Sequence, residues 1–180
     1  MFTRMDEGST EEWLEIRELT LESQRQVADR IISMLEWLRN SVDGYAVDQL
    51  THSLQTAARA EADGADDELV VTALCHDIGK FVSTANHAAM SAEVLAPYVR
   101  PELYQLIQHH QVFQGAAYNH HFGWDANARD AFCDEPWFDL AVTFADDWDQ
   151  MSFDPNFATP PLAHFEERLR TVFAEPRITK

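Results

Sequence analysis

Apolar residues recur every three to four positions along most of this chain, which is the spacing of an amphipathic α-helix. The first such run starts after Ser9, which has Glu12 three residues later, and this pair is the capping-box signature of a helix start. Trp13, Ile16 and Leu19 then continue the period. The pattern therefore predicts a helix that begins at Ser9.

The same period predicts further helices over 27–38, 47–57, 69–75, 86–98, 101–112, 137–151 and 161–173. Breaks at 40–44 and in the acidic segment 61–68 separate the earlier ones, and Pro101 and Pro161 occupy favourable first-turn positions. There is no sustained apolar-polar alternation, no repeat and no glycine-rich phosphate loop. We therefore expect an all-α bundle of six to eight helices, with most of the apolar stripes packed in its core.

Composition restricts the partners of this fold. The chain carries 13 Lys+Arg against 31 Asp+Glu, a net charge of −18. Nucleic acids and anionic membrane surfaces both require a cationic face, so neither is an expected partner. No apolar stretch reaches the roughly 20 residues of a membrane span, and two cysteines without a CxxC pair indicate a reduced compartment. The sequence predicts a soluble, cytoplasmic protein.

The chemistry of the chain is concentrated around ALCHDIGK, residues 73–80. His76 and Asp77 stand at the predicted end of a helix, where Gly79 is expected to act as a left-handed cap. Taken alone, this pair could be nothing more than a polar helix end. A metal site would require further ligands from other helices.

Such ligands are available at helical positions. They are His52, which continues the apolar face of its helix, His87, the adjacent His109 and His110, and the pair Asp146 and Asp149. Neighbouring helical residues point about 100° apart, so only one of the two adjacent histidines can face a given site, and periodicity does not choose between them. The two aspartates lie one helical turn apart and would share a face.

Imidazoles and carboxylates together suit iron, manganese or zinc. An adjacent His-Asp pair has a specific use in such a site, because the carboxylate can bridge two metal ions while the imidazole binds one of them. Dinuclear sites built from side chains of facing helices are a known arrangement. We therefore expect a dinuclear site with Asp77 as the bridge.

The order of His52, His76-Asp77 and a late aspartate resembles the HD-domain superfamily over residues 45–150. The resemblance implies an all-α metalloenzyme, and most members of the superfamily look like metal-dependent phosphohydrolases. It also implies a single domain over 1–180, with N-terminal helices in 1–44, a metal-binding core in 45–152 and a C-terminal helix and tail in 153–180.

A narrower resemblance involves GYAVDQLTHSLQTAARA, residues 44–60. This segment is similar to the one that holds the first ligand in the mixed-valent di-iron oxygenases typified by 2-amino-1-hydroxyethylphosphonate oxygenase. That branch implies an Fe(II)/Fe(III) pair held by four histidines and two aspartates. The matching positions here are His52, His76, Asp77, His87, His110 and Asp149. An alignment to the phosphohydrolases would instead select Asp146.

The chain also departs from those oxygenases. They place a lysine, an arginine and a further histidine around the substrate phosphonate, and the comparable positions here hold Gln114 or Phe113, Asp146 and Lys80. Two basic groups are thus missing, which argues against a phosphonate substrate. Lys80 and Asp146 are the candidate catalytic residues.

Three functions follow from these observations. The first is a di-iron oxygenase that uses O2 to oxidise a small hydroxylated substrate. The second is a phosphohydrolase with manganese or another divalent metal, in which Lys80 would hold the phosphate of a small ester or nucleotide. The third is a binding domain without activity, which the full ligand set argues against because buried charges without a metal are costly.

Overall fold

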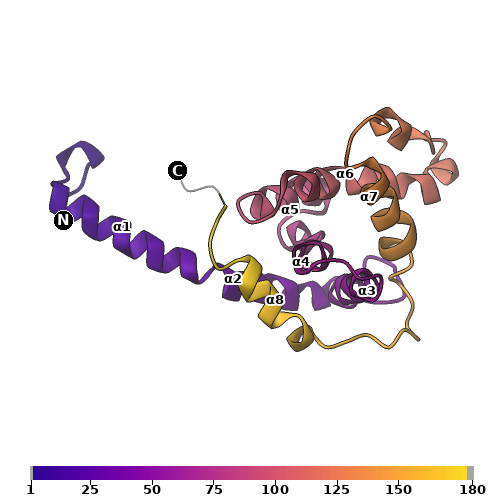
Figure 1. Ribbon diagram of the computed structural model, residues 1–180, viewed down its shortest axis with the longest axis horizontal. Coiled ribbons are helices and arrows are strands. Elements are labelled where there is room, and N and C mark those ends of the chain that lie inside the picture. The colour runs from indigo at the N-terminus through magenta and orange to yellow at the C-terminus, as the bar shows by residue number, and fades with distance from the viewer. Residues whose placement is uncertain (1, 178–180) are drawn as a thin grey trace.

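The computed structural model describes residues 2–177, and every regular element in this part of the chain is helical (Figure 1). The α-helices are α1 (Thr10–Arg25), α2 (Val27–Trp37), α3 (Gln49–Ala62), α4 (Asp67–Cys75), α5 (His87–Leu95), α6 (Pro101–Tyr118), α7 (Phe138–Thr143) and α8 (Glu166–Val172). Short 3₁₀ turns join several of them, and a π-helical segment, Phe144–Asp149, continues α7. The predicted all-α fold is confirmed.

Local sequence sets the helix starts. The Ser9 hydroxyl accepts a hydrogen bond from the Glu12 amide at 3.2 Å, and the Glu12 carboxylate accepts one from the Ser9 amide at 3.0 Å. Asp48 and Asp66 cap α3 and α4 in the same way, each accepting from a backbone amide three residues later. Because a cap of this kind stabilises a helix by about 1 kcal/mol, these residues fix where the helices begin.

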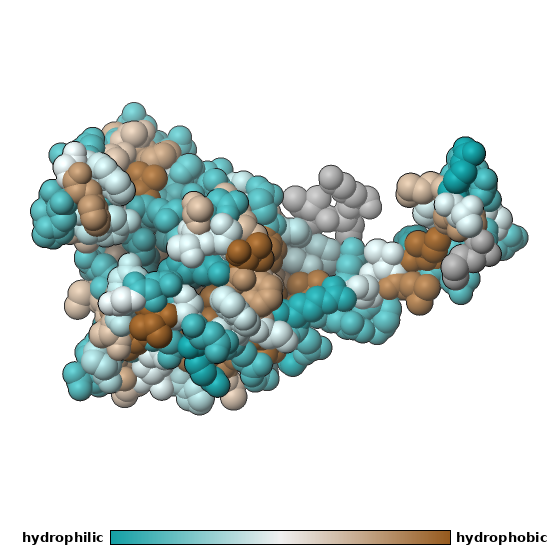
Figure 2. Space-filling view, turned by 180° about the vertical axis from the view of Figure 1, so that it is seen from behind, coloured by the Kyte–Doolittle hydropathy of each residue, from teal (hydrophilic) through white to brown (hydrophobic). Residues whose placement is uncertain are grey.

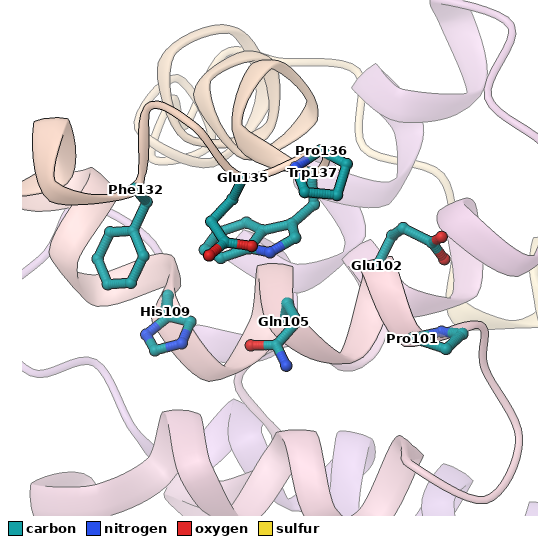
Figure 3. Close-up of a pocket in the computed structure, with 8 residues that line it drawn as sticks. All are labelled: Pro101, Glu102, Gln105, His109, Phe132, Glu135, Pro136 and Trp137. Carbon is teal, nitrogen blue, oxygen red and sulfur yellow. The ribbon is translucent and has the colours of Figure 1, made fainter.

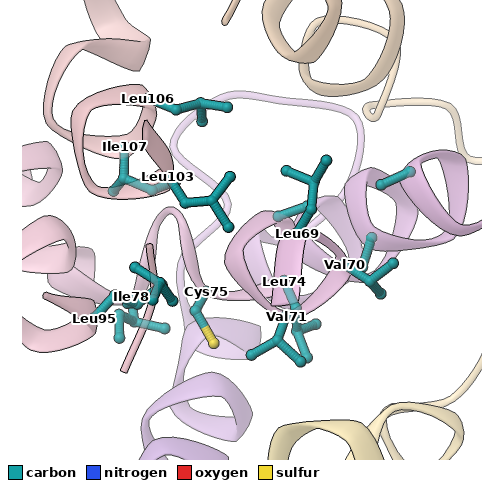
Figure 4. Close-up of a cluster of buried hydrophobic side chains, with 14 of the residues drawn as sticks. Leu69, Val70, Val71, Leu74, Cys75, Ile78, Leu95, Leu103, Leu106 and Ile107 are labelled. Carbon is teal, nitrogen blue, oxygen red and sulfur yellow. The ribbon is translucent and has the colours of Figure 1, made fainter. Parts of the chain in front are cut away.

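The core forms where α4 is enclosed by α3, α6 and α8 (Figures 1 and 4). Leu74, Ile78, Leu95, Leu103 and Leu106 are fully buried there. Each such side chain stabilises the fold by about 1.5–3 kcal/mol relative to an exposed one. Helix α4, which ends just before His76, is therefore held rigidly from several sides.

Helix α1 differs from the sequence expectation. It extends away from the body as a single arm, and none of its residues is buried (Figure 1). Trp13, Ile16 and Leu19, expected to pack in the core, are 37%, 38% and 64% exposed. The view from behind in Figure 2 shows the arm standing clear, with apolar side chains on its surface. The apolar period predicted the helix correctly but not its packing: within residues 2–177 Trp13 meets the ring of Phe2, and no other α-helix packs along the arm.

Several other helices have different limits from those predicted. Helix α6 continues six residues beyond the expected end at Val112, to Tyr118, and the expected helix 161–173 starts as α-helix only at Glu166. The expected helix 137–151 is divided into α7 and the π-helical segment. None of the helices in the described part of the chain combines the length and the apolar character that a membrane span requires.

Candidate metal centre

Five helical segments bring six metal-binding side chains to one place inside the bundle. They are His52 on α3, His76 and Asp77 at the end of α4, His87 at the start of α5, His110 on α6 and Asp149 on the π-helical segment. Each is at most 4% exposed. A cluster of ionisable groups buried this deeply requires balancing charge, because an isolated buried charge is strongly unfavourable.

Gly79 has a different role from the predicted one. It lies in a 3₁₀ turn and is not among the glycines with positive φ, so it is not a left-handed cap. A Cβ at this position would lie 2.3 Å from the backbone oxygen of His87. The Gly79 amide also donates to the Ser91 hydroxyl at 2.9 Å. Glycine is therefore needed here because α5 passes so close, and that close approach brings His87 to the His76-Asp77 pair.

The four histidines of the cluster share one arrangement. The Nδ1 atom of each lies 2.7–3.0 Å from a backbone carbonyl oxygen, namely those of Ser152 for His52, Ala73 for His76, Thr84 for His87 and Ile107 for His110. A carbonyl can only accept, so Nδ1 carries the hydrogen in each ring. The Nε2 lone pair is then directed to the centre, as in histidines that bind metals.

These Nε2 atoms meet in two pairs. The distance between them is 3.1 Å for His52 and His76, and 3.3 Å for His87 and His110. Two acceptor nitrogens at this distance repel each other unless a cation lies between them. The structure thus contains two imidazole pairs, each suited to share a proton or a metal ion.

Asp77 lies between the two pairs. Its Oδ2 atom is 3.4 Å from Nε2 of His76 and 3.6 Å from that of His52. Its Oδ1 atom is 3.0 Å from Nε2 of His87 and 3.5 Å from that of His110. Each carboxylate oxygen therefore faces a different imidazole pair, which is the placement that a bridging ligand requires.

Asp149 completes the His52–His76 side of the cluster, with Oδ1 3.1 Å from Nε2 of His52 and 3.6 Å from that of His76. Oδ1 of Asp149 and Oδ1 of Asp77 are both buried and accept no hydrogen bond from any described residue. Buried carboxylate oxygens without donors, facing imidazole lone pairs, fit a bound metal. Two overlapping groups have the geometry to hold one: His52, His76 and Asp149, and His76, Asp77 and His110.

The pKa values of His76, Asp77 and Asp149 also indicate that the buried carboxylates are stabilised by positive charge. Burial alone would lower the pKa of His76, but Asp77 and Asp149 outweigh it and raise that pKa to about 9. Burial would raise the pKa of both aspartates, yet the imidazoles hold the pKa of Asp149 below its ordinary value and that of Asp77 well below it. Without a metal, this centre retains a proton on His76.

His109 lies outside this cluster. Its ring packs against Phe132, with centroids 4.6 Å apart, and is stacked on Trp137 at 5.4 Å. It lines a separate hollow of about 330 Å³. Figure 3 shows its ring there with the side chains of Gln105 and Glu135. Of the two adjacent histidines that the sequence left open, only His110 faces the other candidate ligands.

Asp146 also lies apart from the cluster. Its carboxylate accepts a hydrogen bond from the Arg129 guanidinium at 2.8 Å and is about one-third exposed. The expectation that Asp146 and Asp149 share a face assumed an α-helix. The Gln150 amide instead bonds to the Ala145 carbonyl five residues back, so the turn is wider and the two carboxylates diverge.

Lys80, the candidate catalytic cation, is already paired. Its ammonium donates to Asp77 Oδ2 at 2.6 Å and to the Gln49 side-chain oxygen at 2.9 Å, and its side chain is 12% exposed. Lys80 therefore neutralises and orients the central carboxylate. A phosphate group could use it only by displacing one of these partners.

The sequence did not predict two further contacts of the centre. The Gln114 amide donates to Asp149 Oδ2 at 2.5 Å. Tyr45, Phe153 and His52 also form a column of stacked rings, with centroids 4.3 and 4.2 Å apart and interplanar angles of 16° and 9°. No periodicity signals such a column, because its members come from a loop, α3 and the segment after the π-helix.

Comparison with known proteins identifies the family of this chain. The family model described as HD domain matches residues 50–154, which is more than half of the chain and includes all six residues of the cluster. No curated protein matches the chain.

Proposed function

This chain belongs to the HD-domain family, and from that membership we propose that it is a dinuclear metal-dependent enzyme that uses O2 to oxidise a small hydroxylated substrate. HD domains bind divalent metals and are generally metal-dependent enzymes. The nature of the two metal ions and of the reaction is our proposal.

The observation that carries the proposal is the position of Asp77 between two imidazole pairs. In the proposed enzyme His52, His76 and Asp149 would hold one ion, His87 and His110 would hold the other, and Asp77 would be a ligand of both. The backbone carbonyls at the four Nδ1 atoms keep the rings oriented. Four histidines and two aspartates are also the ligand set of the di-iron oxygenases that the sequence resembles.

When bound, an Fe(II)/Fe(III) pair would supply the redox chemistry by which O2 oxidises a carbon that carries a hydroxyl group. The chain itself holds and shields that pair. Phe153 covers one face of the His52 ring and Tyr45 covers Phe153, so this side of the centre is protected from bulk water. The Gln114 amide donates to Asp149 and holds that carboxylate in place.

A second candidate is a phosphohydrolase that uses manganese or another divalent metal, as in many HD-domain proteins. Lys80 favours this candidate because it is a cation beside the central carboxylate. However, both of its close partners are protein groups, and its side chain is largely buried. This arrangement leaves no free cation for a phosphate at that position, so we rank oxidation first.

The deciding experiment begins with protein purified from iron-supplemented cells. We expect about two iron ions per chain, a coupled-spin EPR signal from the half-oxidised protein, and O2 consumption with a hydroxylated substrate. Protein loaded with manganese, cobalt or magnesium is assayed in parallel for phosphate release from a nucleotide panel. A mononuclear or zinc-only site in iron-grown protein, or phosphate release without O2 consumption, would overturn the oxygenase proposal.

A further inference from the structure

A small hollow of about 210 Å³ adjoins the metal centre. Six residues line it: Tyr45, Gln114, Ala117, Tyr118, Gln150 and Phe153. Its volume is below the 300–1,000 Å³ that is typical of sites for drug-sized ligands. The hollow is therefore matched to a small molecule.

Two of its walls touch the cluster directly. Gln114 donates to Asp149, and Phe153 is stacked on His52. A molecule in the hollow would therefore contact residues that themselves contact two proposed ligands of one metal ion. This position is where a substrate of the metal centre would bind.

None of the described residues that line the hollow is basic. Lys80 and Arg129 are both already paired, Lys80 with Asp77 and Arg129 with Asp146. The chain as a whole has a net charge of −18, so its field also repels anions. A phosphate, phosphonate or carboxylate group would lack the charged hydrogen-bond partner that such groups usually have.

The two glutamines of the hollow favour a ligand that donates hydrogen bonds, and the Tyr45 and Tyr118 hydroxyls can either donate or accept. The side-chain nitrogen of Gln114 is used by Asp149, and that of Gln150 donates to the Asp146 backbone oxygen at 2.6 Å. No described residue donates to the side-chain oxygen of either glutamine. These two oxygens can therefore accept from a ligand, and the Tyr45 and Phe153 rings offer an apolar wall.

We propose that this hollow is the substrate site and that it takes a small compound with hydroxyl or amino groups on a compact carbon frame and no anionic group. The inference rests on the proposed function, because it assigns a substrate class to the same metal centre. It also explains the paired state of Lys80, since a substrate without an anion needs no free cation.

The test uses three probes that share one carbon frame: glycerol, 2-amino-1,3-propanediol and glycerol 3-phosphate. Their dissociation constants for the metal-loaded full chain are measured by saturation-transfer NMR titration. We expect glycerol or its amino analogue to bind at least about tenfold more tightly than glycerol 3-phosphate. The first two probes show whether a neutral or a cationic donor is preferred.

A variant tests the role of charge. Gln150→Lys places an ammonium at the exposed edge of the hollow, and it should strengthen binding of glycerol 3-phosphate at least about tenfold. Gln24→Lys, which makes the same charge change on the exposed arm α1, should leave all three constants unchanged. Tyr45→Ala removes a half-exposed wall residue and should weaken glycerol or amino-analogue binding several-fold with the metal content unchanged.

Equal or tighter binding of glycerol 3-phosphate by the unmodified protein would overturn the proposal, and so would the absence of binding of all three probes. Metal analysis of the same samples separates this failure from failure of the proposed function. Protein with two irons that prefers the phosphate ester contradicts only the substrate class. Protein with less than one metal ion per chain contradicts the dinuclear function, whereas the response to Gln150→Lys still reports on the hollow.

Discussion

Asp77 shows how single residues determine this centre. A carboxylate that is 1% exposed would be strongly unfavourable without nearby positive charge. Lys80 supplies one cation, and the protonated His76 supplies another in the absence of metal. The two carboxylate oxygens nevertheless face two imidazole pairs, and one of them accepts no hydrogen bond from the described residues. The residue is thus arranged to receive metal ions.

The adjacent histidines provide the first prediction. His110→Ala should lower metal affinity at least about 100-fold, because it removes a group that we propose binds the metal directly and even the loss of an outer partner costs 10–100-fold. His109→Ala should leave the metal content unchanged and cost about 0.5–1.5 kcal/mol of stability through the lost stacking on Trp137. Elemental analysis after dialysis and thermal melts check both. Equal metal loss in the two variants would contradict the assignment.

The proton on His76 gives the second prediction. Its pKa is raised from 6.5 to about 9, so its stabilisation of the metal-free fold is complete below about pH 6.5 and is lost as the pH rises through 9. A metal ion must displace this proton, so metal affinity should rise with pH up to about 9. Calorimetry in buffers of different ionisation enthalpy should show about one proton released per chain at pH 7. Proton release that does not fall towards pH 9.5 would contradict this prediction.

At the scale of elements, the π-helical segment decides which late aspartate enters the centre. The third prediction compares Asp149→Asn with Asp146→Asn, which make the same chemical change three residues apart. Asp149→Asn should lose metal from the His52–His76 side. Asp146→Asn should keep it and lower stability by at most about 1 kcal/mol, because its pair with Arg129 is partly exposed. Elemental analysis of both proteins gives the answer, and metal loss confined to Asp146→Asn would favour the alternative alignment.

The sequence predicted the existence of the helices much better than their packing. The apolar period and the capping box at Ser9 identified α1, and Pro101 correctly marked the start of α6. The arm-like position of α1 was not predictable, because an amphipathic pattern does not specify whether a partner helix is present. The π-turn at Ala145 was also missed, since its sequence resembles that of an ordinary helix.

The candidate site was predictable to a similar extent. His52, His76 and Asp77 could be selected by order and spacing, whereas the choice between His109 and His110 required the rotation of α6 in the folded protein. Phe153 is 101 positions from His52, so its stacking on that ring has no local signature. Sequence thus supplies the types of ligand, and tertiary packing supplies the groups that orient and cover them.

At the scale of the whole molecule, the centre ties together elements that are far apart in the chain. Helices α3, α5 and α6, the turn that follows α4 and the π-helical segment each contribute at least one of its side chains. A metal that binds only the folded form stabilises it by RT ln(1 + [L]/Kd), which is about 4 kcal/mol at a thousandfold excess over Kd. That residues 1–180 form a single domain of this family remains a prediction.

The arm α1 provides the fourth prediction. Because none of its residues is buried, a protein that starts at residue 27 should keep its full metal content and melt within about 3 °C of the complete chain. A protein that starts at residue 41 also lacks α2 and the turn after it, and with them the buried Ile31, Leu35 and Leu38, each contributing about 1.5–3 kcal/mol. That second truncation should fail to fold or should lose its metals. Thermal melts and elemental analysis of both truncations make the comparison. A loss of metal from the first truncation would show that the arm supports the centre despite its exposure.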